Sequence, residues 1–206
     1  MPMTVYVLDL HTLTQADVDA LFSTLPPFRK EDAKRCRRKE GYVQSVAGFC
    51  LVRYALKQTD PQIDTDTWTF AENGKPSLAV GHPYFNLSHT AHCVAVALSD
   101  QEEIGVDVEK IKPRSMAFAK KFCSDTELAM IQAASDQASE MIRVWSAKEA
   151  VAKQSGVGIK KGARELCTDT AKSVRLAANG IPHWLSVSPA TTSPSIIWVD
   201  KKELLI

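Results

Sequence analysis

One stretch of alternating residues constrains both fold and chemistry: Ile104-Gly105-Val106-Asp107-Val108-Glu109. In an extended strand successive side chains point to opposite faces, so Gly105, Asp107 and Glu109 share one face and the aliphatic residues share the other. The two carboxylates then lie about 7 Å apart along the backbone. That is within reach of one hard cation such as Mg²⁺. An ordinary half-buried strand with a solvated acidic face is the alternative that this stretch leaves open.

Size and charge leave room for one large domain or two small ones. The chain has 206 residues, of which 45% are hydrophobic, as expected of a globular protein with a packed core. The formal net charge of +1 does not indicate a nucleic-acid-binding protein. Two segments, residues 29–39 and 110–121, are nonetheless rich in lysine and arginine. Each could be a solvated helix face or could hold an anionic partner.

The cysteines and the amino terminus favour a cytoplasmic protein. The five cysteines are scattered and form no CxxC pair, so neither a disulfide framework nor a zinc knuckle is indicated. This usage is typical of a reducing compartment. The first residues lack a basic region followed by an apolar run, so we expect no signal peptide. No apolar run is long enough to span a bilayer.

Periodicity predicts helices on both sides of a central set of short strands. A buried strand is expected over residues 4–10, and helices follow up to residue 58. Short strands separated by turns occupy residues 68–109. Helical patterns return over residues 116–154, including a capping-box pattern at Ser124-Asp125-Thr126-Glu127. Strand-like pieces make up the tail, and no internal repeat is visible in the residues.

A second polar pattern lies in the predicted helix that ends near Gln154. Trp145, Glu149 and Lys153 are four residues apart and share one face. A Glu–Lys pair on a solvated surface is one interpretation. The other is that Glu149 supplies a third oxygen ligand to the same metal. Lys148 and Lys153 would then be placed to contact phosphate oxygens bound to it.

A third pattern consists of Gly74-Lys75-Pro76 and Phe85-Asn86-Leu87-Ser88-His89. A lysine in a turn and a Ser-His pair at a strand end are both plausible phosphate contacts. His89 and His92 could instead suggest zinc, but a zinc site needs three or four ligands and no further one is near in sequence. A structural histidine at the strand end is the other alternative.

These patterns occur together in one family, and the chain resembles the 4′-phosphopantetheinyl transferases of the surfactin-synthetase-activating (Sfp) type. The resemblance extends over roughly residues 29–162. Each motif is weak by itself, whereas their order and separation are specific. The segments that carry it are residues 74–76, 85–89, 104–109, 122–127 and 145–153.

The resemblance implies a mixed α/β (α+β) fold of two similar halves, related by a pseudo-twofold, with the active cleft between them. Residues 1–103 would form the coenzyme A half and residues 104–206 the metal and carrier half of one compact unit. The implied reaction is the Mg²⁺-dependent (or Mn²⁺-dependent) transfer of 4′-phosphopantetheine from coenzyme A to a serine of an apo carrier protein. Adenosine 3′,5′-bisphosphate is the other product. The expected protein is a monomer that modifies acyl or peptidyl carrier proteins of fatty acid, polyketide or nonribosomal peptide biosynthesis, without nucleic acid or membrane partners.

The resemblance also assigns roles to residues. Lys153 and Glu149 would be catalytic, with Glu149 or a water on the metal as the base. This chain has Gln44 where relatives commonly carry an arginine, so Arg29 and Arg38 are the candidates for the nucleotide's 3′-phosphate. The implied metal ligands are Asp107, Glu109 and Glu149, and the implied coenzyme A contacts are Lys75, Ser88, His89, Lys148 and Lys153.

The basic segment after the acidic strand is the predicted docking surface for the carrier, because carriers of this family's kind present an acidic helix. Burial of the interleaved apolar residues in the core is the alternative. Glu127 has two open interpretations, as the cap of its own helix or as a residue of the cleft. The predicted carrier contacts are Lys112, Arg114, Met116, Lys120 and Phe122.

Two other functions fit part of the sequence. A narrower holo-acyl-carrier synthase would run the same chemistry, but those chains are half this length and assemble as trimers. A non-catalytic protein that binds coenzyme A or a carrier is the alternative from another class. Simple binding does not require three carboxylates beside a pyrophosphate, so the sequence favours the enzyme.

Overall fold

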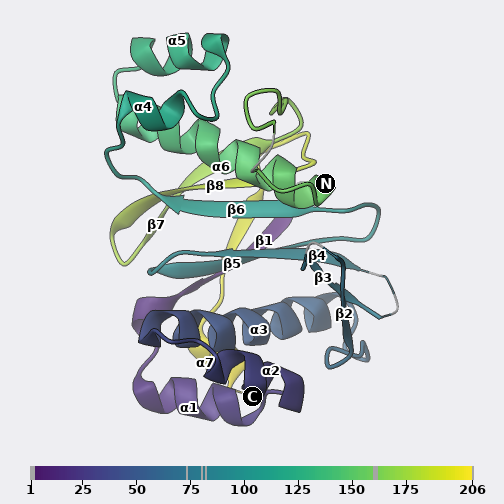
Figure 1. The fold of residues 1–206 in the computed structure, drawn as a ribbon. Coiled ribbons are helices and arrows are strands. Elements are labelled where there is room, and N and C mark those ends of the chain that lie inside the picture. The colour runs from purple at the N-terminus through teal and green to yellow at the C-terminus, as the bar shows by residue number, and fades with distance from the viewer. Residues whose placement is uncertain (1–2, 73, 80, 82, 160–161, 206) are drawn as a thin grey trace.

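The computed structural model describes residues 3–72, 74–79, 81, 83–159 and 162–205. Figure 1 shows four layers, in which two β-sheets lie face to face and helices cover the outer side of each. The strand order is β4-β5-β1-β9 in one sheet and β6-β8-β7 in the other, and a separate ribbon pairs β2 with β3. The mixed α/β fold expected from the sequence is confirmed.

The first half of the chain builds the four-stranded sheet and its helical cover. Thr14 begins α1 with a reciprocal capping box to Asp17, and Pro27 occupies the first turn of α2. The elements are β1 (Thr4–Asp9), the 3-10 helix η1 (Leu10–Thr12), α1 (Gln15–Ser23), α2 (Pro27–Lys34), α3 (Lys39–Thr59), β2 (Trp68–Phe70), β3 (Pro76–Leu78), β4 (Tyr84–His89) and β5 (Cys93–Ser99).

The second half builds the three-stranded sheet. The predicted capping box at Ser124 is present and begins α5, and Gly156 in the left-handed conformation ends α6. The elements are β6 (Gly105–Lys110), α4 (Met116–Ala119), α5 (Asp125–Ala133), α6 (Gln137–Ser155), β7 (Lys172–Ala178) and β8 (Ile181–Ser188).

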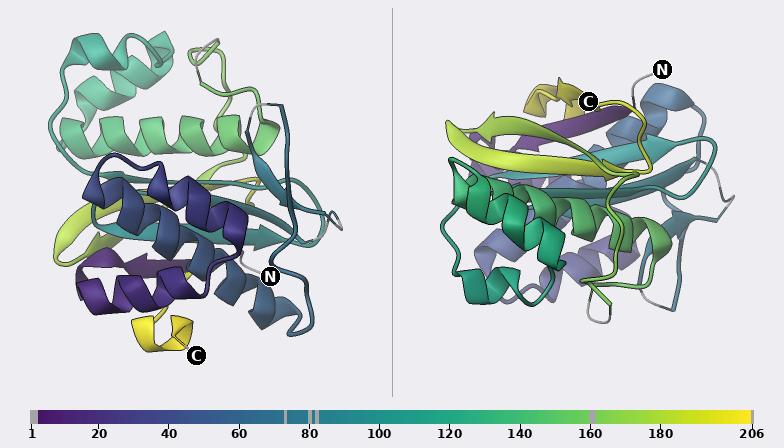
Figure 2. Two further views of the ribbon diagram at one scale, coloured as in Figure 1. Left: turned by 60° about the horizontal axis from the view of Figure 1, so that its bottom comes forward. Right: turned by 90° about the horizontal axis from the view of Figure 1, so that it is seen from above.

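The tail leaves the second half and returns to the first. Strand β9 (Ser195–Trp198) pairs in parallel with β1. Helix α7 (Lys201–Leu204) is tied to α1 by an ion pair between Lys201 and Asp17 (2.6 Å). It is tied to α3 by a hydrogen bond from the Tyr54 hydroxyl to Glu203 (2.7 Å). Figure 2 (left) shows the yellow C-terminal helix beside the purple N-terminal one.

The two halves repeat one topology. Each runs from a strand through short helices to a long helix, α3 or α6, and then to an antiparallel pair of strands. The resulting orders, β4-β5-β1 and β7-β8-β6, correspond strand for strand. The predicted division between residues 103 and 104 falls in the connection from β5 to β6, and the tail crosses it. As a boundary between units, that division stays a prediction.

An apolar core lies between the two sheets. Val5 and Val7 of β1 pack with Val106 and Val108 of β6, and all four are 0–2% exposed. This contact fixes β6 against the first half and leaves the other face of β6 for α6. The five cysteines are free. Within the described ranges, no helix is both long and apolar enough to cross a membrane.

Candidate functional site

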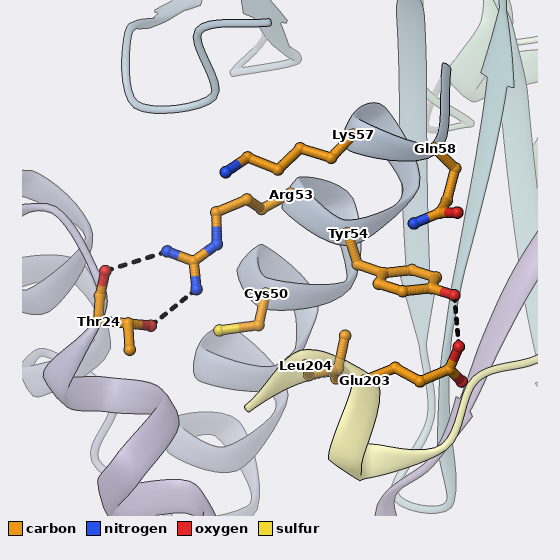
Figure 3. Close-up of a pocket in the computed structure, with 8 residues that line it drawn as sticks. All are labelled: Thr24, Cys50, Arg53, Tyr54, Lys57, Gln58, Glu203 and Leu204. Atoms are coloured by element: carbon orange, nitrogen blue, oxygen red, sulfur yellow. Dashed lines mark hydrogen bonds between the residues drawn. The ribbon is translucent and has the colours of Figure 1, made fainter. Parts of the chain in front are cut away.

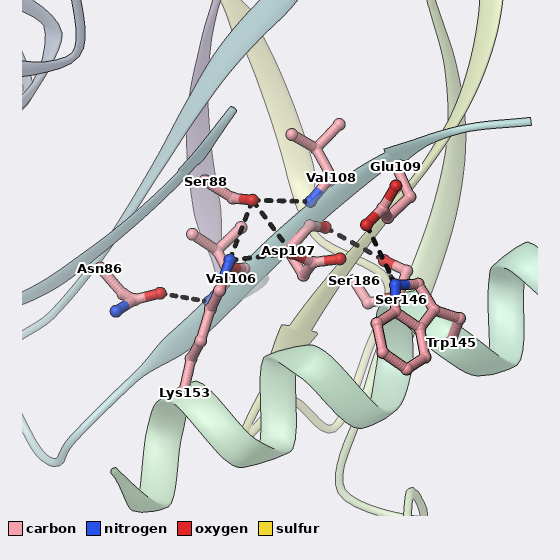
Figure 4. A network of polar contacts seen from close by, with 10 residues as sticks. All are labelled: Asn86, Ser88, Val106, Asp107, Val108, Glu109, Trp145, Ser146, Lys153 and Ser186. Carbon is pink, nitrogen blue, oxygen red and sulfur yellow. Dashed lines mark hydrogen bonds and ion pairs between the residues drawn. The ribbon is translucent and has the colours of Figure 1, made fainter. Parts of the chain in front are cut away.

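Strand β6 is an edge strand whose backbone is satisfied by side chains of the other half. The Val106 N–H donates to Asn86 Oδ1 (3.0 Å), and the Val108 N–H donates to Ser88 Oγ (3.2 Å) (Figure 4). Both acceptors come from β4. Because buried backbone donors need partners, these two side chains act in place of a neighbouring strand. The seam between the halves therefore runs along β6.

Gly105 lets α6 approach this strand closely. A Cβ atom on Gly105 would lie 2.0 Å from the Ala150 carbonyl oxygen and 2.5 Å from the Gln154 nitrogen. Real Cβ atoms do not come this near to backbone atoms, so only glycine permits the observed packing. The close approach places Glu149 and Lys153 of α6 over the acidic face of β6.

Asp107 lies at the centre of a buried polar network. It is 4% exposed, and its Oδ1 accepts hydrogen bonds from the Ser88 hydroxyl (3.0 Å) and from Lys153 Nζ (2.8 Å). Lys153 Nζ also donates to Ser88 Oγ (2.9 Å) and to the Val106 carbonyl (3.1 Å). The second oxygen, Oδ2, is buried and has no hydrogen-bond partner among the described residues. Such an atom is costly to bury without a partner, and a bound water or cation would supply one.

The other two acids lie close enough to interact with Asp107. Glu109 Oε1 accepts a hydrogen bond from the Trp145 indole N–H (3.0 Å), and burial followed by the Asp107 charge raises the pKa of Glu109. Burial also raises the pKa of Glu149 to about 7, with Asp107 and Glu109 adding to the effect and Lys153 opposing it. The three carboxylates are therefore near enough to influence one another's pKa, and their role as ligands of one metal stays a prediction.

Carboxylate oxygens such as those of Asp107, Glu109 and Glu149 suit a hard divalent cation. In this structure, however, the three side chains do not point to one position. Among the described residues, no group of three His, Cys, Asp or Glu side chains has the arrangement of a metal site. Asp107 Oδ1 is engaged by Lys153, whereas Oδ2 is free to coordinate. Three mutually repelling oxygen donors with one lysine gain from an added cation.

A pocket of about 290 Å³ opens beside the carboxylates. Lys75 lies at its wall, where Nζ contacts Glu103 and donates to the carbonyl oxygens of Ile104 (3.2 Å) and Gln154 (3.1 Å). The structure thus brings Lys75 of the first half to one pocket with Glu149 and Lys153 of α6. Its lining includes Lys75, Pro76, Asn86, Leu87, Glu149, Ala152, Lys153 and Val157.

His89 and Ser88 end β4 in this region. His89 is exposed, and partial burial of its ring, followed by the Lys153 charge, lowers its pKa. Ser88 is 5% exposed, and its hydroxyl donates to Asp107 while accepting from Lys153 and the Val108 N–H. Ser88 therefore links Asp107, Lys153 and the backbone of β6 through its hydroxyl group. His89, the next residue, is exposed to solvent.

Lys148 is not brought to this pocket. Its side chain is 0% exposed, and Nζ donates to the carbonyl oxygens of Ala163 (2.9 Å) and Leu166 (3.0 Å) and pairs with Glu127 (3.1 Å). Successive residues of an α-helix point in directions about 100° apart. Lys148 therefore points away from the pocket that its neighbour Glu149 lines. Glu127 also accepts the Ser124 N–H (2.7 Å) as the cap of α5, which accounts for that residue.

The two arginines predicted for the nucleotide lie apart from the carboxylate network. Arg29 is held over the rings of Phe49 (5.6 Å) and Trp68 (5.5 Å) and pairs with Asp32 (3.2 Å). Burial lowers the pKa of its guanidinium. Arg38 is exposed at the N-cap of α3. No contact described here joins either residue to Lys75 or His89.

The predicted carrier surface is accessible only in part. Phe122 is 2% exposed and packs on Trp145 and Phe118, with ring centroids 4.8 and 5.1 Å away. Its prediction as a surface contact is corrected, because the aromatic ring fills the core beneath α4. Met116 is half-buried against the same cluster. The basic residues Lys112, Arg114 and Lys120 are exposed, and Arg114 lies 5.3 Å from the Phe118 centroid.

Sequence reasoning assigned no role to Asn86 and missed the serines behind Asp107. Ser146 Oγ donates to the Asp107 carbonyl (3.2 Å) and is hydrogen-bonded to Ser186 Oγ (3.0 Å). Asn86 and Ser88 alternate on one strand, which is a signal for two side chains on one face. Ser186 lies far away in sequence, and only the register of β8 against β6 brings it to Asp107.

The chain has a mixed α/β fold with carboxylates of β6 and α6 beside a pocket, and the proteins that it resembles in sequence are named as enzymes of one class. A family model described as the 4′-phosphopantetheinyl transferase superfamily matches residues 103–187. The 4′-phosphopantetheinyl transferase Sfp of Bacillus subtilis (strain 168) is 33% identical over 156 residues, covering 71% of this chain and 67% of the relative. AcpT of Escherichia coli (strain K12), named as a 4′-phosphopantetheinyl transferase, is 38% identical over 137 residues. The match covers 64% of this chain and 66% of the relative. The chain therefore belongs to the 4′-phosphopantetheinyl transferase superfamily, and the prediction of an enzyme of this class is confirmed.

Proposed function

We propose that the protein transfers the 4′-phosphopantetheine arm of coenzyme A to a serine of an apo carrier protein, in a Mg²⁺-dependent reaction that releases adenosine 3′,5′-bisphosphate. The observation that carries the proposal is the gathering of Asp107, Glu109 and Glu149 beside a pocket lined by Lys75 and Lys153. Carboxylates that repel one another next to lysines suit a cation and a pyrophosphate bound together.

Asp107, Glu109 and Glu149 would hold the cation, which supplies Lewis-acid stabilisation of the pyrophosphate when bound. Mn²⁺ could replace Mg²⁺ because it takes the same oxygen ligands. Lys153, which is now 2.8 Å from Asp107, would turn its ammonium to the phosphate oxygens. A preoriented cation at the place where negative charge develops lowers the barrier. Ser88 is hydrogen-bonded to Asp107 and to Lys153, and it would hold these two side chains in position.

The transfer forms a bond between the serine Oγ and the β-phosphorus and breaks the bond from that phosphorus to the bridging oxygen. The serine proton must leave as this happens. Burial raises the pKa of Glu149 to about 7 in the protein without a cation, and Glu149 would take this proton as the base. Adenosine 3′,5′-bisphosphate departs with the bridging oxygen and the electron pair of the broken bond.

Lys75 and His89 would contact the phosphates of coenzyme A, because both border Lys153 in the structure. Arg29 and Arg38 remain the candidates for the 3′-phosphate. We do not include Lys148, because its ammonium is enclosed by carbonyl oxygens and Glu127.

The exposed basic residues Lys112, Arg114 and Lys120, with Met116 beside them, would dock the acidic helix of the carrier. This segment follows Lys110 directly, so a bound carrier would present its serine near the seam. We further propose action in the cytoplasm, as a monomer, on acyl or peptidyl carriers of fatty acid, polyketide or nonribosomal peptide biosynthesis.

Mass spectrometry of the carrier tests the function. The protein is incubated with coenzyme A, Mg²⁺ and an apo carrier, and the carrier should gain the mass of one phosphopantetheine. A carrier whose serine is replaced by alanine is the matched control. Chelation of Mg²⁺ should stop the gain, and added Mg²⁺ should restore it. Binding of coenzyme A without any mass gain would instead support a non-catalytic binding protein.

A further inference from the structure

A second cavity, of about 640 Å³, lies on the outer face of the first half (Figure 3). It is formed where the end of α1, the second part of α3 and helix α7 meet. Figure 1 places these helices at the opposite side of the molecule from α6, so the groove is separate from the carboxylate site. Its lining residues are Thr24, Cys50, Arg53, Tyr54, Lys57, Gln58, Glu203 and Leu204.

Arg53 is held in a fixed orientation at the wall of this groove. Its Nη1 donates to the Thr24 carbonyl (3.1 Å) and its Nη2 donates to Thr24 Oγ1 (2.8 Å). The guanidinium also lies 5.9 Å from the Phe49 ring centroid. A guanidinium has five N–H donors, so these contacts orient it and leave further donors. Arg53 therefore has a fixed position and N–H donors that can bind a further acceptor.

A second cation lies one turn further along the same helix. Lys57 is exposed and lines the groove with Arg53. Within the described part of the chain, neither side chain forms an ion pair with a carboxylate. Glu203 is the acidic lining residue, and its oxygens are bound to the Tyr54 hydroxyl (2.7 Å) and the Asp200 N–H (2.8 Å). Glu203 keeps its negative charge, but Figure 3 shows its carboxylate at the Tyr54 hydroxyl, on the side of the groove away from Arg53 and Lys57.

The floor of the groove is uncharged and largely apolar. Cys50 is 2% exposed and Leu204 is 4% exposed, and Figure 3 shows the Tyr54 ring on the Leu204 side of the groove. Burial raises the pKa of the Cys50 thiol to about 11, and the bond to Glu203 raises the pKa of Tyr54 to about 12. Both groups stay neutral at physiological pH. The groove combines two cations on its wall with an apolar floor.

We propose that this groove binds a small phosphate monoester, with the phosphate between Arg53 and Lys57 and the organic part over Cys50, Tyr54 and Leu204. A phosphate monoester carries about −1.5 to −2 charges at pH 7, so Arg53 and Lys57 attract it more strongly than they attract a carboxylate with one charge. Arginine binds phosphate oxygens through paired N–H groups, and the volume is that of a small-molecule site. The proposal does not depend on the transfer reaction.

Phenyl phosphate is a suitable probe, because it joins a phosphate monoester to an apolar ring. It is titrated into the full-length protein, and the backbone amide shifts are followed by NMR. The largest shifts should fall on residues 24, 50–58 and 203–204. Benzoate, with one charge, should bind at least about 10-fold more weakly. Binding should also weaken from pH 7.5 to pH 5, as the phosphate takes up its second proton near pH 6.

Two variants decide between a specific site and general attraction to a basic surface. Lys57→Gln should weaken phenyl phosphate binding at least about 5-fold, and the double variant with Arg53→Gln should abolish it. Lys57 is exposed, so its replacement leaves the fold intact even if Arg53→Gln weakens the end of α1. Lys121→Gln with Arg175→Gln removes the same charge from exposed residues of the second half and should leave binding unchanged.

Three results would overturn the proposal. The first is shifts confined to the pocket of Lys75 and Lys153, because phosphate would then bind only at the carboxylate site. The second is equal binding by Lys57→Gln and the unchanged protein. The third is equal loss in both double variants, which would indicate charge attraction without a site.

Discussion

The first and second halves use one topology for different purposes. In β1 the residues that face the long helix α3 are Tyr6 and Leu8, which belong to an apolar cluster. In β6 the residues that face the long helix α6 are Asp107 and Glu109. On their opposite faces both strands supply valines to the shared core. The comparison shows that the fold needs apolar side chains between the sheets, while the layer beneath one long helix is free to carry chemistry.

The replacement of Asp107 by alanine makes β6 resemble β1 and should have the largest effect. We expect turnover to fall at least about 100-fold, or about 2.7 kcal/mol of barrier, because Lys153 and the proposed cation lose their shared partner. The measurement is the rate at which the carrier gains mass. Exposed Glu102→Ala is the control, and near-normal Mg²⁺-dependent activity in Asp107→Ala would exclude the assignment.

Two glycine substitutions test the helix packing of the two halves. Gly105→Ala would drive a Cβ atom into Ala150 and Gln154, so α6 must move. We expect a loss of about 1–3 kcal/mol in the free energy of unfolding, together with lower activity. Gly48→Ala in α3 is the matched control, because its Cβ would meet Leu87 at an ordinary 3.5 Å. Urea denaturation of both variants measures this difference, and equal stabilities would contradict it.

Lys75→Ala and His89→Ala probe the contribution of the first half to the site. Their proposed partners are phosphates that coenzyme A already carries in the ground state. Each change should therefore raise KM for coenzyme A about 10-fold, near 1.4 kcal/mol, and alter kcat much less. Steady-state kinetics with varied coenzyme A measures both constants. An unchanged KM in both variants would favour a structural role for His89.

The raised pKa of Glu149 predicts how pH affects stability before any cation binds. The usual pKa of 4.5 is raised to about 7, so the folded protein holds this proton more tightly than the unfolded chain. The free energy of unfolding should then fall as pH rises from about 4.5 to 7. Because Glu149 is partly exposed, we expect about 1–2 kcal/mol after allowance for solvent screening.

Comparison with Glu149→Gln isolates this effect from other titrating groups. Denaturation is followed in chelator at several pH values, and the difference between the two proteins is taken. The Gln variant should lack the fall, and added Mg²⁺ should reduce it in the unchanged protein. A difference that does not vary with pH would show that the pKa of Glu149 is ordinary.

The smallest effect is expected at the carrier surface. Reversal of Lys112 and Arg114 to glutamate should raise KM for the carrier several-fold and leave KM for coenzyme A unchanged. Steering by exposed charges is screened over about 8 Å at physiological salt, so the penalty should shrink at high salt. Unchanged carrier kinetics at low salt would direct the search to the basic residues 29–39.

The local features of the site could be predicted from the sequence, whereas its long-range supports could not. Period-two alternation places Asp107 and Glu109 on one face, and four-residue spacing places Glu149 and Lys153 on another. Spacing alone does not say which way Lys148 points, because the packing of α6 on α5 decides that. Spacing likewise does not say whether Phe122 is buried in the core or exposed to a carrier, because packing against Trp145 and Phe118 decides that.

The two-half architecture was expected only from the resemblance. The first and second halves share strand order but not residues, since the equivalent layer is apolar in one and acidic in the other. The return of β9 to β1 was also invisible, because a four-residue strand carries no information about its partner. Pairings between distant segments depend on the whole fold and have no local signature.

The parallel pairing of β9 with β1 has a consequence for how the molecule is made. A ribosome produces the first half well before residue 195, yet the sheet of that half gains its fourth strand only when residues 195–198 have emerged. Helix α7, which locks onto α1 and α3, comes later still. The sheet of the first half therefore stays incomplete while the ribosome synthesises the second half. Folding of the two units is thus coupled in time, and a nascent chain stalled before residue 195 would expose the outer edge of β1 to other chains.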